Sequence, residues 1–418
     1  MTKVGSDKLA LLGGEKLYLD DVALADWPPV DKETAEQLMK VYLSRNWSFG
    51  GPEELAFNEE YARFHDAAYG ISMANGTVTL ECALHALGVG AGDEVVVPAY
   101  TWMATAMVVK YVGAQIVFVD VEPETLCLDP KKFEAAITDK TKAVIPVHML
   151  ASMADMEAIL AIAKRHNIFV IEDCAHAQGG QWNGKGVGSW GHVGSFSFQQ
   201  SKTMASGEGG ICITNDGELA ERIARIKHIG YPVGSRQGKP GSPPPLGLVC
   251  HNYRSTEFQA VILRGQLKKL PELLALYDSN VKYLFDLVND IPGIRLQEPG
   301  RLATRQSYYG LDIIFDKGEL SEVKKIVILE ALAKEGIMGL NVGCGPVYKH
   351  MLFNLPESDW RIAGDISVTE VTVDKHTLSL LHTAFGTPRE HMEKIAEAFR
   401  KVSDNAGELK KYQAEEQQ

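Results

Sequence analysis

Residues 143–173 read AVIPVHMLASMADMEAILAIAKRHNIFVIED, a strand pattern, a helix pattern and a second strand pattern in succession. The outer runs, Ala143–His148 and Phe169–Glu172, are short, apolar and rich in branched side chains, which is typical of strands covered on both faces. Between them, Met153–His166 places apolar residues at helical spacing. This order predicts a strand–helix–strand unit of an open, mostly parallel α/β sheet.

The same alternation continues on both sides of this unit. Val95–Val97 and Ile116–Asp120 are further strand-like runs, and Thr77–Leu87 has the periodicity of a helix. Ser195–Gln199 and Gly210–Thr214 are also strand-like, but too few residues separate them for a helical crossover. We therefore expect an α/β sheet flanked by helices, with at least one antiparallel member.

The composition changes near residue 292, where IPGIRLQEPG interrupts the helical pattern. We expect a large α/β domain at residues 51–290 and a smaller C-terminal α+β domain at residues 291–418. Residues 1–50 are expected to form an N-terminal segment that packs on the small domain. The run Tyr231–Gly247, rich in proline, glycine and serine, predicts an exposed loop within the large domain.

Bulk properties exclude several classes of partner. The 418 residues include 42 Lys plus Arg and 54 Asp plus Glu, a net charge of −12, which argues against binding to nucleic acid or to an anionic membrane. No run reaches the roughly 18 apolar residues of a membrane-spanning helix, and the N-terminus lacks the pattern of a signal peptide. The six cysteines are scattered, so we expect reduced thiols, no metal site and a cytoplasmic location.

Two candidate binding features follow predicted strands, where open α/β sheets bind ligands. Gly76 and Thr77 open a predicted helix, and the helix N-terminus there is suited to a phosphate group, although a capped turn is the simpler reading. Asp173 ends a buried strand, where its carboxylate can hold a protonated heteroaromatic nitrogen, and His176 can reach a substituent of the same ring. The alternative is an Asp that caps the next turn and a structural His.

Two further features complete the set. Lys202 lies in a tight, glycine-rich connection between two strands, SFSFQQSKTMASGEGG, and a desolvated lysine there can form a Schiff base; a solvated surface lysine is the alternative. Ser197 lies in the strand before it. Trp102 follows another strand and can stack on a planar ring or simply fill the core. Together these groups predict a pyridoxal 5′-phosphate site, in which Asp173 keeps the pyridine nitrogen protonated and Lys202 acts as Schiff-base lysine and proton carrier.

The motifs that carry these residues resemble the DegT/DnrJ/EryC1/StrS family of sugar aminotransferases, which are fold-type I pyridoxal-phosphate enzymes. The similarity runs from about residue 45 to residue 270 and includes the stretches ANGTVTLECALHALGVGAGDEVVVPAYTWMATA, PVHMLASMADM, VIEDCAHAQG, SFSFQQSKTMASGEGG and HNYRSTEFQAVIL, with RQSYYG at Arg305–Gly310 beyond it. Within the family, the sequence looks closest to the glutamine-dependent scyllo-inosose and 2-deoxy-scyllo-inosose aminotransferases, with 3-amino-5-hydroxybenzoate synthase a near relative.

The resemblance assigns roles residue by residue. It implies that Lys202 and Asp173 are the catalytic pair, and that Lys at the Schiff-base position marks the transaminating branch rather than the sugar dehydratases. It also implies a homodimer with sites at the interface. The residues implied to hold the cofactor are Gly76, Thr77, Trp102, Asp173, His176, Ser197 and Lys202, with Asn252 reaching the phosphate of the neighbouring subunit.

The expected reaction is transfer of an amino group from L-glutamine or L-glutamate to a ketone of a cyclitol or a keto-sugar. Two alternatives stay open at this point. The acceptor can be a nucleotide-linked keto-sugar, or the scaffold can serve a dehydratase or aromatising synthase. A regulatory protein that binds the cofactor without turnover is disfavoured, because no DNA-binding module is recognisable.

Overall fold

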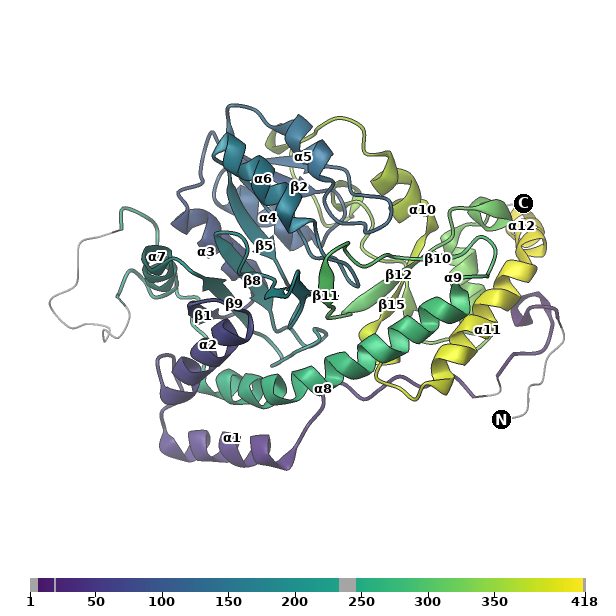
Figure 1. Ribbon diagram of the computed structural model, residues 1–418, viewed down its shortest axis with the longest axis horizontal. Coiled ribbons are helices and arrows are strands. Elements are labelled where there is room, and N and C mark those ends of the chain that lie inside the picture. Colours follow the sequence, from purple (N-terminus) through teal and green to yellow (C-terminus); the bar gives the residue numbers. More distant parts are fainter. Residues whose placement is uncertain (1–6, 19, 233–245, 416–418) are drawn as a thin grey trace.

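The computed structural model describes residues 7–18, 20–232 and 246–415 (Figure 1). Most of the predicted loop at 231–247 lies outside the described residues, at 233–245. Among the helices that are described, none has both the length and the apolar character needed to cross a membrane.

The largest sheet contains eight strands in the order β1-β9-β8-β5-β4-β2-β3-β14. Their bounds are β1 Tyr69–Met73, β2 Glu94–Pro98, β3 Gln115–Val119, β4 Thr141–Val144, β5 Phe169–Asp173, β8 Val193–Ser197, β9 Gly210–Thr214 and β14 Trp360–Ile362. Neighbours from β8 to β14 run parallel, whereas β9 is antiparallel to both β8 and β1. The predicted α/β class, with a mostly parallel sheet, is confirmed, and so is its antiparallel member.

Helices cover both faces of this sheet (Figure 1). One face carries α3 (Gly76–Ala86), α4 (Met103–Tyr111) and α7 (Gly217–Lys227), and the other α2 (Pro52–Phe64), α5 (Pro130–Ala136), α6 (Met156–His166) and the first half of α8 (Glu257–Val288). In β2, Val95 and Val97 pack against the first group of helices and Val96 against the second. Both faces are buried, which explains the continuous apolar runs in the sequence.

A second, four-stranded antiparallel sheet lies beside the first, in the order β10-β12-β15-β13. Its strands are β10 Arg295–Leu296, β12 Gly310–Ile314, β15 Thr377–Leu381 and β13 Leu340–Asn341, and the helices packed with it are α9 Lys325–Lys334, α11 Glu390–Asp404 and α12 Ala406–Glu415. A small sheet of β11 (Ala303–Arg305), β6 (Gln181–Trp182) and β7 (Lys185–Gly186) joins sequence from both predicted domains.

The N-terminal segment packs into the core around the second sheet. Leu9 and Leu17 are buried in that core, and the backbone N–H groups of Ala10 and Leu17 each donate to the Glu335 carboxylate at 2.8 Å. Lys401 donates to the same carboxylate at 2.9 Å, so the buried charge is paired. The predicted domain boundaries stay a prediction.

Candidate active site

A cavity of about 900 Å³ lies between the two larger sheets. Asp173 and Ser197 of the large sheet, with Thr77 from the start of the neighbouring helix α3, line one side. Asn341 and Ser379 of the four-stranded sheet line another. The cavity opens beyond the carboxyl ends of parallel strands, which is where ligands bind in open α/β sheets.

The first turn of α3 forms one end of the cavity. The Asn75 side chain caps the helix by accepting from the N–H groups of Thr77 and Val78, both at 3.1 Å. A Cβ at position 76 would lie 2.7 Å from the Cβ of Ser197, so only glycine allows β8 to approach this closely. As a result Gly76, Thr77 and Ser197 meet at a helix N-terminus, whose dipole favours an anion.

Asp173 ends β5 and is buried in the cavity wall. Its Oδ2 accepts from the Thr105 hydroxyl at 2.8 Å, and its Oδ1 accepts from the Ala175 N–H at 3.1 Å. Burial raises the pKa of this carboxyl, while these hydrogen bonds and the charge of Lys202 act in the opposite direction. A positively charged ligand atom next to Asp173 would further favour its ionised form.

Lys202 extends from the turn that connects β8 and β9. Its N–H donates to the Gln199 carbonyl at 2.8 Å, and its Nζ lies 4.3 Å from the centre of the Tyr309 ring. Burial lowers the pKa of Lys202 to about 8, although the Asp173 charge opposes that shift. About a tenth of this amine is therefore uncharged at pH 7, far more than for an ordinary lysine, and the uncharged amine is the form needed for a nucleophile or a base.

His176 stacks on the ring of Tyr309, with ring centres 4.1 Å apart. Its Nδ1 accepts from the Leu150 N–H at 3.5 Å. Burial, together with the nearby Lys202 charge, holds the pKa of His176 well below its usual range. The imidazole is therefore neutral and can present a hydrogen-bonding group to a ligand without adding charge.

The last two predicted residues occupy different positions. Trp102 caps α4, lines the cavity and is 51% exposed. Asn252 is exposed and does not line the cavity of its own chain; its backbone forms an isolated bridge with His228. The cavity thus brings together every predicted cofactor residue except Asn252, and their roles stay a prediction.

Residues 28–400 match the DegT/DnrJ/EryC1/StrS aminotransferase family. The chain belongs to this family. An L-glutamine:2-deoxy-scyllo-inosose aminotransferase from Streptomyces kanamyceticus is 35% identical over 402 residues, 90% of this chain and 92% of that protein. A Streptomyces fradiae protein of the same name is 34% identical over 421 residues, 96% and 99% of the two chains. The crystal structure of 3-amino-5-hydroxybenzoic acid synthase matches with a TM-score of 0.83 at 30% identity, covering 91% of this chain and 98% of that one.

The chain is thus an aminotransferase, and its family and structural neighbours imply pyridoxal phosphate as the cofactor. The wall of the aminotransferase cavity fits that group. A glycine-lined helix N-terminus with two hydroxyls suits its phosphate, a buried carboxylate suits its pyridinium nitrogen, and an amine of lowered pKa suits its aldehyde.

The aminotransferase also has a polar wall that we did not predict from the sequence. Asp312, Ser379 and Asn341 lie opposite one another in register across β12, β15 and β13. Asp312 is fully buried and accepts from the Ser379 hydroxyl at 2.5 Å and from the Tyr100 hydroxyl at 2.8 Å. Burial raises the pKa of Asp312 to about 6. No local motif marks these residues; only Tyr309, in RQSYYG, lies in a recognisable stretch.

Proposed function

We propose that this aminotransferase moves the amino group of L-glutamine to the ketone of a cyclitol of the scyllo-inosose type. The observation that carries the proposal is the similarity to L-glutamine:2-deoxy-scyllo-inosose aminotransferases, which spans at least 90% of this chain and of each relative. The donor leaves as the corresponding 2-oxo acid, and the acceptor exchanges its ketone oxygen for an amine.

Residues of the large sheet and of the helices packed on it would hold pyridoxal phosphate. Gly76, Thr77 and Ser197 surround the helix N-terminus suited to its phosphate, and Trp102 offers a ring surface. Asp173 would hold the proton of the pyridine nitrogen. When bound, this cofactor supplies an electron sink that makes the Cα–H bond of the donor acidic.

Lys202 is the group in the cavity that can move this proton. Its amine has a lowered pKa and is held above Tyr309, on the same wall as Asp173. Tyr309 in turn is anchored by the hydrogen bond between its hydroxyl and that of Ser201, 2.9 Å apart. The lysine can therefore take a proton from the donor and return one to the acceptor without a change of side-chain environment.

The polar wall supports a polyhydroxylated acceptor. Tyr100 and Ser379 both donate their protons to Asp312, so their oxygens present lone pairs to the cavity. Such acceptors pair with hydroxyl donors of a cyclitol ring. Among the described residues that line the cavity, Lys202 is the only Lys or Arg side chain, which favours a free cyclitol over a nucleotide diphosphate sugar.

The test is a matrix of donors and acceptors with the purified enzyme. L-glutamine and L-glutamate are each combined with scyllo-inosose, 2-deoxy-scyllo-inosose and 3- or 4-keto nucleotide sugars, and products are identified by mass spectrometry. We expect amination of a cyclitol with L-glutamine as the better donor. Amination of nucleotide sugars alone would assign the enzyme to amino-sugar synthesis, and a product that has lost water instead of gaining an amine would identify a dehydratase or aromatising synthase.

We also propose a homodimer in which Asn252 serves the cavity of the neighbouring subunit. Its exposure, outside the cavity of its own chain, supports this arrangement. Mixing the variants Lys202→Ala and Asn252→Ala tests it, because a mixed dimer contains one site with both native residues. Activity above that of either variant alone is expected, and a monomer in light scattering would contradict the proposal.

We propose a cytoplasmic location. All six cysteines are free thiols, four of them buried, which suits a reducing compartment. Cell fractionation with an antibody to the native protein would check it, and recovery outside the cytoplasmic fraction would contradict it.

A further inference from the structure

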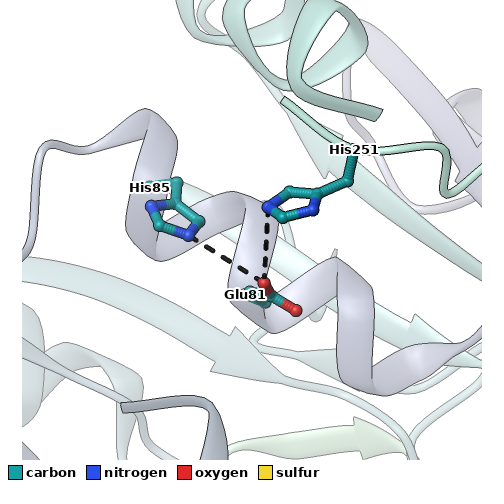
Figure 2. Close-up of side chains that lie close together, drawn as sticks. All are labelled: Glu81, His85 and His251. Atoms are coloured by element: carbon teal, nitrogen blue, oxygen red, sulfur yellow. Dashed lines mark ion pairs between the residues drawn. The ribbon is translucent and has the colours of Figure 1, made fainter. Parts of the chain in front are cut away.

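Two histidines flank one carboxylate at the rim of the cavity (Figure 2). Glu81 and His85 lie one turn apart on α3, and His251 reaches toward them from the segment before α8. The Nε2 atoms of His85 and His251 are each 3.9 Å from the same Glu81 oxygen. One ligand-type atom of each residue lies within 4.8 Å of the other two.

The backbone that carries His251 is held in place. Its N–H donates to the Ile226 carbonyl at 2.7 Å, and the N–H of Tyr253 donates to the Lys227 carbonyl at 3.0 Å, both at the end of α7. Glu81 and His85 share a regular helix. The backbone at all three residues is thus fixed, which lowers the conformational-entropy cost of ordering their side chains around a ligand.

Tyr253 adds an outer layer to the cluster. Its hydroxyl donates to both oxygens of Glu81, at 3.2 and 3.3 Å, and its ring stacks on His251 with centres 4.7 Å apart. Hydrogen bonds and contacts of this kind orient the ligands of metal sites. Tyr253 and Glu81 also line the cavity, whereas the two histidines lie outside its lining.

A second cluster, His148, Glu172 and Cys174, shows what a purely structural arrangement looks like. All three residues are fully buried, and Glu172 accepts from the N–H groups of Gly188, Trp190 and Gly191 at 2.7–2.8 Å. Its lone pairs are used by the backbone. In the described part of the chain no backbone N–H donates to the Glu81 side chain, so that carboxylate keeps lone pairs available.

We propose that Glu81, His85 and His251 bind a divalent transition-metal ion of the zinc class, with water in the remaining position. Two imidazole nitrogens and a carboxylate oxygen form a donor set that zinc accepts. Ligands of a tetrahedral zinc ion are about 3.4 Å apart, given bonds of about 2.1 Å. To bind the ion, the two histidine–Glu81 separations of 3.9 Å would close by about half an ångström through side-chain rotation. The two histidine ligand atoms, which lie within 4.8 Å of each other, would close by up to about 1.4 Å. The sequence predicts no metal site because its cysteines are scattered; folding brings His251 to a helix pair some 170 positions earlier in the chain.

The position of the ion suggests its effect. An ion there would tie α3, whose first turn contributes Gly76 and Thr77 to the cavity, to the segment that carries Tyr253. It would also neutralise the one carboxylate that the cluster shares with the cavity lining. The site is thus separate from the amino-transfer chemistry but adjacent to the place where anions are expected to bind.

Zinc titration of the cofactor-loaded enzyme against a chromophoric chelator tests the proposal. We expect one zinc ion per chain, with affinity reduced at least about tenfold in His85→Gln and in His251→Gln. His166→Gln is the matched control, because His166 also lies 3.9 Å from a carboxylate, that of Glu134, but belongs to no three-ligand group within the described part of the chain. Circular dichroism and melting temperature in chelator-treated buffer establish that each variant is folded.

Two further measurements separate the site from adventitious binding. Cobalt(II) should give the visible absorption bands of a low-coordinate site in the wild type and lose them in His251→Gln. Tyr253→Phe, which keeps the ring but removes the hydroxyl, should weaken zinc binding about tenfold. Equal zinc affinity in the wild type and both histidine variants overturns the site, and so does a wild type that binds no zinc. None of these readouts depends on turnover, so they stand apart from the test of the proposed function.

Discussion

The two walls of the cavity are built in different ways. The large-sheet wall takes its functional groups from contiguous stretches, such as Asp173 in VIEDCAHAQG and Lys202 in SFSFQQSK. The polar wall takes single residues from separate strands. Ser379 of β15 pairs with Asn341 of β13 in the cavity lining and with the buried Asp312 of β12 behind it. The difference teaches that contiguous stretches build one wall, which the proposed function assigns to the amino-transfer chemistry, whereas long-range pairing builds the other, which it assigns to the acceptor.

Among substitutions in the large-sheet wall, Lys202→Ala should cause the largest loss of turnover. Loss of the group that carries the proton should lower turnover by about 10⁴-fold, at the upper end of what acid–base catalysis contributes. Steady-state amination of the cyclitol measures it, with far-ultraviolet circular dichroism as the folding control. Turnover within tenfold of the wild type would show that another group moves the proton.

Asp173→Asn should have the next largest effect. It removes the negative charge suited to a pyridinium nitrogen but keeps the side-chain shape, so we expect kcat to fall by about 10²-fold. Thr105→Val is the matched control, since it removes only one hydrogen bond to Asp173 and should cost about tenfold or less. Equal losses in the two variants would mean that the carboxylate acts through packing rather than charge.

The lowered pKa of Lys202 predicts a pH dependence. Because its pKa is about 8, the uncharged fraction of the amine rises about tenfold between pH 7 and pH 9. In cofactor-free enzyme, reductive methylation of Lys202, followed by peptide mass spectrometry, should accelerate across this range and then level off. An ordinary lysine, with a pKa of about 10.4, would still be accelerating at pH 10. Such behaviour of Lys202 would contradict its desolvated setting.

The smallest effect is expected on the polar wall. Tyr100→Phe removes the hydroxyl that donates to Asp312 at the cavity lining, so the KM for the ketone should rise about fivefold. The single-turnover reaction with L-glutamine should keep its rate, because Lys202 and Asp173 are unchanged. Ser379→Ala should behave in the same way. If either substitution slowed the reaction with L-glutamine as much as the reaction with the ketone, the two walls would not have separate roles.

The sequence predicts what lies within short stretches. The strand patterns led to the α/β sheet because buried strands have an apolar run that is visible locally. The helix start at Gly76 and the turn around Lys202 follow from glycine placement. These features put most of the predicted cofactor residues on one cavity wall.

The features of the fold and the site that the sequence does not predict depend on contacts between distant parts of the chain. Tyr100 and Asp312 are 212 positions apart, and no local pattern pairs them. Tyr309 is directed into the cavity after Tyr308, whose φ of 51° is a left-handed conformation that tyrosine rarely adopts. Trp360–Ile362 returns to the edge of the large sheet from a region that we assigned to the small domain. Such long-range pairings become visible only once the chain is folded.

The helix α8 has a consequence for how the protein unfolds. It is 32 residues long, or about 48 Å at 1.5 Å per residue, and belongs to both hydrophobic cores. Leu263 and Leu270 pack in one core, and Val281 and Leu284 pack in the other. Neither core can lose its packing without exposing part of a helix that the other needs. The two halves should therefore melt as one cooperative unit, with slow amide hydrogen exchange in the buried turns on either side of Pro271.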